Sequence, residues 1–80
     1  MQNSVDQQVI EFTATYTGVS VGDVNNSTTL ESIGIITKPD IMEYLTELED
    51  SFGLKYESGD ENGIVTVGDA AAMITRKLNG

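Results

Sequence analysis

The chain has 80 residues, of which 13 are acidic and 4 are basic, and its formal net charge is −9. A chain of this length has room for one core, so we expect residues 1–80 to form a single domain. The absence of cysteine and histidine excludes disulfides, thiolate and imidazole nucleophiles, and the usual zinc sites. The negative charge argues against nucleic acid or an anionic membrane as a partner, and favours a protein with a basic patch.

The sequence contains no apolar run of transmembrane length and no visible signal peptide, so we expect a cytoplasmic protein. We expect it to be a monomer. No nucleophile lies in a pattern that would pair it with a base, so we expect no catalytic residues and no enzyme activity.

The first predicted helix spans residues 4–17, after a frayed end at residues 1–3. Ser4 and Gln7 have the spacing of a capping box, and Gly18 ends the helix. One helical stripe is formed by Val5, Val9, Phe12 and Tyr16. The segment FTATYT within this helix is also compatible with a strand.

Residues 19–36 form a long predicted loop. Residues 20–24 have the pattern of one helical turn, with Val21 and Val24 pointing inward. Four apolar residues are expected to pin the rest of the loop to the core: Leu30, Ile33, Ile35 and Ile36. Gly34 is expected to supply a backbone angle that other residues avoid.

The strongest helix signal in the sequence covers residues 37–52. Thr37 and Asp40 have the spacing of a capping box, Pro39 suits the first turn, and Gly53 suits the position after the helix. The apolar positions recur at steps of three and four: Ile41, Tyr44/Leu45, Leu48 and Phe52.

Carboxylates recur on the other side of this helix at Asp40, Glu43, Glu47 and Asp50, with Glu49 nearby. Acidic side chains at this spacing repel one another, and no basic residue in the middle of the helix relieves the repulsion. Two interpretations remain open: a solvated helix face, and a surface that docks on a basic partner.

After this helix, residues 54–56 are expected to be extended. Residues 57–63 (ESGDENG) form an acidic, turn-rich loop that is expected to hold a short irregular helix near residues 60–63. The loop is rich in oxygen ligands but lacks the spacing of a calcium-binding EF-hand, because Ala71 occupies the position of the closing glutamate. We therefore expect no metal site.

The last predicted helix begins with a third capping box at Thr66 and Asp69. Val65, just before it, is placed to staple onto Ala70. The apolar stripe of this helix consists of Val67, Ala70, Ala71, Ile74 and Leu78. Arg76 and Lys77 lie in the final turn, where cations suit the helix dipole.

Three segments occur in the order found in acyl and peptidyl carrier proteins. Residues 30–35 (LESIGI) resemble the loop before the family's second helix, and residues 41–54 (IMEYLTELEDSFGL) resemble its acidic second helix and the exit from it. Residues 64–74 (IVTVGDAAAMI) resemble the start of its last helix. The chain is thus similar to this family over nearly its whole length.

The resemblance implies an all-α fold, an irregular four-helix bundle with three main helices and one short helix. It also implies a non-catalytic carrier or docking module in acyl-chain metabolism of the fatty acid or polyketide type. Its partners would be acyl-processing enzymes with basic patches, and its docking residues would be Asp40, Glu43, Glu47 and Asp50.

Carrier proteins attach a 4′-phosphopantetheine arm to a serine in an Asp-Ser-Leu motif at the start of the second helix. Counting forward from Gly34, this position falls on Thr37, whereas counting backward from the end of the helix it falls on Lys38. The triplet ESI, with Ser32 at its centre, resembles the motif but lies upstream of the helix. Ser32 and Thr37 are therefore the candidate attachment sites for the arm.

Three hypotheses follow from these observations. The chain carries a group on an arm at one of these hydroxyls, or it has the carrier fold without the arm and acts by docking. The alternative, from a different class, is an acidic interaction protein that is unrelated to acyl transfer.

Overall fold

The computed structural model describes residues 4–80, so the expectation for residues 1–3 lies outside it. It contains three α-helices, α1 (Val5–Thr17), α2 (Lys38–Ser51) and α3 (Val67–Leu78). Two single-turn 3₁₀ helices, η1 (Val21–Asp23) and η2 (Glu31–Ile33), lie between α1 and α2. The described chain forms no β-strand, which confirms the all-α prediction, and the segment FTATYT lies within α1.

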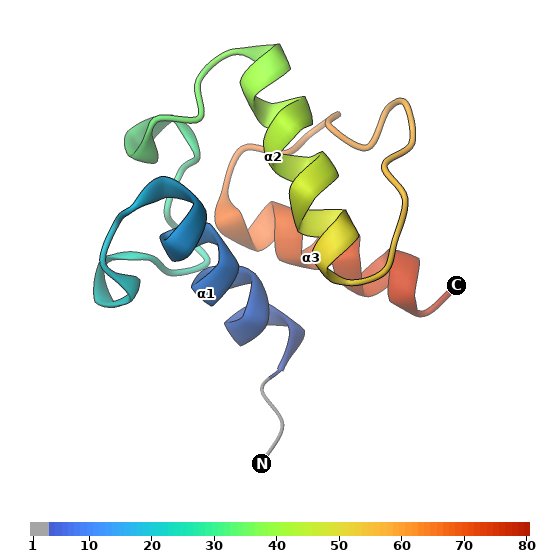
Figure 1. The fold of residues 1–80 in the computed structure, drawn as a ribbon, viewed down its shortest axis with the longest axis horizontal. Helices are drawn as coiled ribbons and strands as arrows, with labels where there is room; N and C mark the ends of the chain where they lie inside the picture. The colour runs from blue at the N-terminus through green and yellow to red at the C-terminus, as the bar shows by residue number, and fades with distance from the viewer. Residues whose placement is uncertain (1–3) are drawn as a thin grey trace.

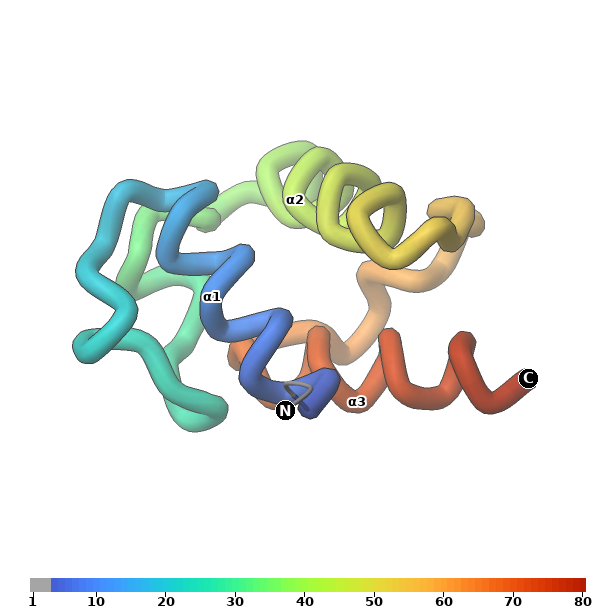
Figure 2. The backbone as a smooth tube through the Cα atoms, turned by 60° about the horizontal axis from the view of Figure 1, so that its bottom comes forward, coloured from blue at the N-terminus to red at the C-terminus, as the bar shows by residue number. Residues whose placement is uncertain are grey.

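α1 packs against both of the other helices, more extensively against α3 than against α2 (Figure 2). The loop from α1 to α2 runs along one side of the molecule, and the loop from α2 to α3 runs along the other (Figure 1). The core between them consists of Val9, Ala14, Val24, Leu30, Ile35, Tyr44, Leu45, Leu48, Ile64, Val67, Ala70, Ala71, Met73 and Ile74.

α1 begins and ends at the predicted residues, but only the Ser4 half of the predicted capping box is formed. The Ser4 side chain accepts a hydrogen bond from the backbone N–H of Gln7 (3.1 Å), as a helix cap does. Gly18 ends the helix with φ at 78°, a backbone angle that costs glycine little. The buried face carries Thr13, whose hydroxyl would be costly to bury alone; it is hydrogen-bonded to the hydroxyl of Tyr44 in α2.

α2 and α3 both begin with complete capping boxes, as predicted. Asp40 Nα–H donates to the Thr37 hydroxyl, and the Asp40 carboxylate accepts from the Thr37 N–H, each at 3.2 Å. In α3, the Asp69 carboxylate accepts from the N–H groups of both Thr66 and Val65 at 3.0 Å. These local hydrogen bonds satisfy backbone donors that no helical carbonyl can reach.

The apolar stripe predicted for α3 is buried except at its end. Leu78 is 45% exposed, because the last turn of α3 extends beyond the core. Val65, which was expected to staple onto Ala70, is also exposed. The staple itself stays a prediction.

The loop between α1 and α2 is pinned as expected at three of the four predicted positions. Leu30 and Ile35 are buried and Ile33 packs against the core, but Ile36 is 60% exposed, so the prediction for Ile36 was wrong. The N–H of Ile36 is within hydrogen-bonding distance of the Asp40 carboxylate (3.4 Å), so this residue already belongs to the exposed entry of α2. Gly34 has φ at 94°, as predicted.

The helical turn predicted at residues 20–24 forms only in part. η1 ends at Asp23, and the extended backbone of Val24 turns its side chain into the core while Val21 remains 51% exposed. The helical spacing on which the prediction for Val21 depended therefore does not continue through Val24.

The same loop is also fastened to the start of α3. An isolated antiparallel bridge joins Thr29 and Thr66. Leu30 donates to the Val65 carbonyl, and Gly68 donates to the Asn26 carbonyl, both at 2.9 Å. The long loop is therefore held by backbone hydrogen bonds as well as by its apolar side chains.

The loop between α2 and α3 contains turns where a short helix was expected. Residues 58–63 form consecutive turns, with backbone hydrogen bonds from Asp60 to Glu57 and from Asn62 to Gly59. The described chain therefore has three α-helices, and the fourth, short helix of the predicted bundle is not found. None of the three is both long and apolar enough to cross a membrane.

Candidate functional site

The four carboxylates predicted to lie on one side of α2 are all exposed: Asp40, Glu43, Glu47 and Asp50. We call this surface the acidic face. Within residues 4–80, the ion pairs of the structure are made by other carboxylates. The acidic face therefore keeps its negative charge available to a partner.

One side chain of α1 contacts the acidic face. The Tyr16 hydroxyl donates to Glu43 at 3.3 Å. Burial, and then the negative charges of Glu43 and Glu47, raise the pKa of Tyr16 above its ordinary value. Asp40 also belongs to the capping box of α2, and its hydrogen bonds with Thr37 hold its pKa below the usual value.

A groove of about 450 Å³ lies beside the C-terminal half of this face. Its apolar lining comes from Phe12 of α1 and from Leu54, just after α2. Glu47 and Asp50 of the acidic face also line it, with Thr46, Ser51 and Lys55. The acidic face is thus bordered by a partly apolar depression.

Glu49 does not belong to the acidic face, contrary to the prediction that placed it nearby. Its side chain is 0% exposed and forms an ion pair with Lys77 of α3. Burial raises the pKa of Glu49 above its ordinary value, and the hydrogen bond from Lys77 only partly offsets this effect.

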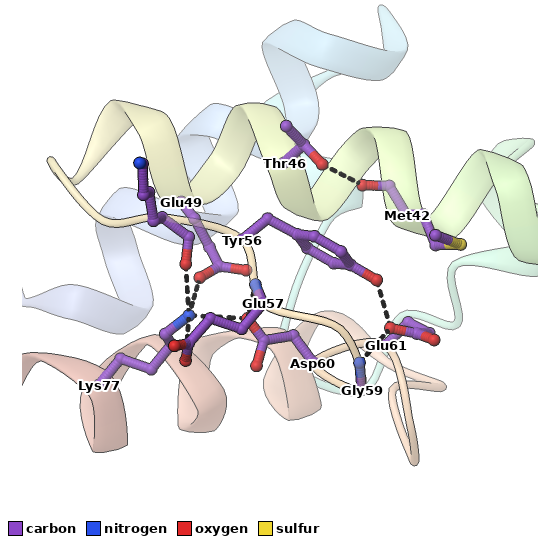
Figure 3. A network of polar contacts seen from close by, with 10 residues as sticks. Met42, Thr46, Glu49, Tyr56, Glu57, Gly59, Asp60, Glu61 and Lys77 are labelled. Atoms are coloured by element: carbon purple, nitrogen blue, oxygen red, sulfur yellow. Dashed lines mark hydrogen bonds and ion pairs between the residues drawn. The ribbon is translucent and has the colours of Figure 1, made fainter.

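The Lys77 ammonium is the centre of a polar network that joins three parts of the chain (Figure 3). Besides Glu49, it donates to the Asp60 carboxylate and to the Lys55 carbonyl, each at 2.7 Å. Glu57 lies 3.6 Å away. Burial acts to lower the pKa of Lys77, but the hydrogen bonds to Asp60 and Glu49 raise it above the ordinary value.

The acidic loop is fastened at a second point by Glu61. This carboxylate accepts from the Tyr56 hydroxyl and from the Gly59 N–H, and it lies 3.7 Å from the Lys38 ammonium. Two of the loop carboxylates, Asp60 and Glu61, are thus turned inward. In the described part of the chain, no group of three or more acidic side chains is arranged to hold a metal ion.

Both candidate hydroxyls for a phosphopantetheine arm are exposed, and each makes a local hydrogen bond. The Ser32 hydroxyl, in η2, donates to the Thr29 carbonyl at 2.7 Å. The Thr37 hydroxyl caps α2 by accepting from the N–H of Asp40. Thr37 therefore adjoins the acidic face, whereas Ser32 lies in the preceding loop.

The Lys77 network was not predicted, although the position of Glu49 in the sequence indicates that its side chain is buried. Glu49 lies four residues after Leu45 and three before Phe52, on the apolar side of α2. A carboxylate at such a position requires a buried partner. The identity of that partner depends on how α3 packs, which the sequence does not reveal.

No family model matches this chain, and no curated protein matches it either. The candidate functional features are therefore those of its own geometry: the acidic face of α2 and the hydroxyls of Ser32 and Thr37.

Proposed function

We propose that this protein is a non-catalytic module of the carrier-protein type, which docks on basic patches of acyl-processing enzymes through the acidic face of α2. The observation that carries the proposal is that Asp40, Glu43, Glu47 and Asp50 are all exposed on one side of one helix. Repulsion among these side chains costs a few tenths of a kcal/mol per pair, and a basic partner would relieve it. Complementary charge also speeds association.

The proposal includes the finer fold assignment, an irregular bundle like that of carrier proteins. The element order supports it: a first helix, a long pinned loop, an acidic second helix with a cap at Thr37, and a final helix. The turns at residues 58–63 depart from that pattern, since carrier proteins have a short helix at the corresponding place.

Neither candidate hydroxyl for the arm matches the family pattern in full. Thr37 adjoins the acidic face, but its hydroxyl already caps α2. Ser32 has the usual residue type, but it lies in η2 rather than at the start of α2. We therefore propose docking as the function, and attachment of 4′-phosphopantetheine is tested by a separate experiment.

A phosphopantetheinyl transferase of broad specificity is a suitable probe for both questions. Its binding to the wild-type chain is compared with binding to Glu47→Lys and Asp23→Lys by calorimetry at two salt concentrations. Asp23 is an exposed residue of η1 outside the acidic face. Both variants replace a carboxylate with an ammonium, so they change the net charge equally. We expect Glu47→Lys to weaken binding roughly tenfold, about 1.4 kcal/mol, and Asp23→Lys to have little effect. Equal weakening would show that net charge alone is responsible, and would refute the docking face.

Intact mass after incubation with this transferase and coenzyme A addresses the arm. A mass gain that is lost in Ser32→Ala or in Thr37→Val identifies the attachment site. No gain, while a control carrier protein is modified, refutes attachment of the arm and leaves docking to be decided by the binding experiment.

The alternative is an acidic interaction protein unrelated to acyl transfer. It predicts no specific binding to the transferase, together with binding of a basic protein such as lysozyme that is sensitive to Glu47→Lys. The same exposed carboxylates support this alternative, so the choice of partner distinguishes the two functions.

A further inference from the structure

The network around Lys77 contains more negative charge than its one cation can balance. Three carboxylates approach the ammonium: Glu49 from α2, and Asp60 and Glu57 from the loop between α2 and α3. Glu57 is 75% exposed at its side chain, so water solvates its charge. Glu49 and Asp60 are 0% and 16% exposed, so two carboxylates with little access to water share one ammonium.

One oxygen of this network has no partner. Glu49 Oε1 accepts from Lys77, whereas Glu49 Oε2 is buried and makes no hydrogen bond within the described chain. A buried carboxylate oxygen without a donor is costly. A proton on Oε2 removes the second buried negative charge and leaves Oε1 free to accept from Lys77.

We propose that Glu49, Lys77 and Asp60 form a proton-linked clasp that closes the loop between α2 and α3, and that Glu49 is the group that takes up and releases the proton. The clasp reaches the loop at three points, because Lys77 also binds the Lys55 carbonyl and lies near Glu57. It also joins α2 to α3 directly, so its state bears on how the two helices are held together.

Other charged and titratable groups that face the clasp come from the loop and from the start of α2. Tyr56 and Glu61 are hydrogen-bonded to each other, and Lys38 lies beside Glu61. Tyr56 and Glu61 alternate along the chain with the residues that Lys77 contacts, so they form a second attachment of the same loop.

The pKa shifts of the two carboxyl groups give the direction of the pH dependence. Burial raises the pKa of Glu49, so its contribution to closure is complete below the pKa of a free glutamate and is lost as pH rises through the raised value. Burial also acts to raise the pKa of Asp60, but hydrogen bonds from Lys77 and from the Glu57 N–H lower it overall. The contribution of Asp60 to closure of the loop is therefore lost only as pH falls through its lowered pKa. The clasp is tightest in mildly acidic solution, above the ordinary aspartate pKa of about 3.9.

The test is an NMR titration of the full chain from pH 3 to pH 9. Side-chain carboxyl ¹³C shifts report the ionisation of Glu49 and Asp60, and amide hydrogen exchange at residues 55–63, expressed as protection relative to α1, reports closure of the loop. We expect Glu49 to ionise above its ordinary pKa, and we expect loop protection to fall as pH rises and to level off where Glu49 ionises. Each unit by which the pKa is raised corresponds to about a tenfold increase in the opening equilibrium.

Glu49→Gln has nearly the shape of the protonated side chain and cannot ionise. In this variant the fall in loop protection with rising pH should disappear. The matched control is Glu57→Gln, which neutralises an exposed carboxylate beside the same ammonium and should retain the wild-type pH dependence. If Glu49→Gln does not fold, the wild-type titration decides alone. A Glu49 carboxyl that ionises at or below its ordinary pKa, or loop protection that does not fall as pH rises toward the pKa of Glu49, would overturn the proposal.

Discussion

The buried hydrogen bond between Thr13 of α1 and Tyr44 of α2 allows a quantitative test of how these two helices are held together. Both side chains are 0% exposed, and their hydroxyls are paired with each other. Tyr44→Phe removes one hydroxyl and leaves the other buried without its partner, which costs about 1–3 kcal/mol. Thr13→Val, which keeps the side-chain volume, should cost a similar amount for the same reason.

The double variant, Thr13→Val with Tyr44→Phe, removes both hydroxyls and leaves no orphaned polar group. It should therefore be more stable than the sum of the two losses predicts, with a coupling energy of about 1–3 kcal/mol. Such a change is easy to measure, because a domain of this length has a total free energy of unfolding of only about 4–12 kcal/mol.

Urea unfolding followed by circular dichroism measures these differences, provided that the m-value stays constant across the variants. Tyr16→Phe is a matched control, because the Tyr16 hydroxyl donates to the exposed Glu43 carboxylate. It should change the free energy of unfolding by less than about 0.5 kcal/mol. Single variants at Thr13 and Tyr44 that are neutral, or losses that simply add, would refute the argument.

Two further predictions concern close packing and tyrosine ionisation. A Cβ atom on Gly68 would lie 2.9 Å from the Asn26 carbonyl oxygen, whereas one on Gly22 would meet nothing within 4 Å. Gly68→Ala should therefore lower the free energy of unfolding by about 1–3 kcal/mol, and Gly22→Ala should have little effect in the same urea experiment. Burial raises the pKa of Tyr44, and the hydrogen bond to a glutamate raises that of Tyr56, in both cases to about 12. In an absorbance titration these two tyrosines should ionise at a higher pH than tyrosine in the urea-unfolded chain. The stability that they contribute should be complete below pH of about 10 and lost toward pH 12. Ionisation of all tyrosines near pH 10 in the folded protein would contradict this prediction.

The helices could be predicted from the sequence because their signals are local. Thr37 with Asp40, and Thr66 with Asp69, lie three residues apart, so the groups that cap each helix are fixed by the helix itself. The exposed acidic face follows from the same helical period. These features needed no knowledge of how the helices pack.

The features that the sequence did not predict depend on distant partners. The buried Glu49 is paired with Lys77 of α3, and the two residues are far apart in the chain. The loop at residues 58–63 forms turns rather than a helix, and Asp60 and Glu61 there are bound to Lys77 and Tyr56. Ile36 was expected in the core on hydropathy alone, but its place next to the cap of α2 directs it to the solvent.

The bridge between Thr29 and Thr66 has a consequence for the order of events during folding. The capping boxes and apolar stripes of the helices use neighbouring residues, so helices of this kind can begin to form within microseconds. The bridge joins two segments separated by nearly half of the chain, and the entropy of closing that large loop must be overcome before its hydrogen bonds form. We therefore expect the bridge to form later in folding than the helices that it connects.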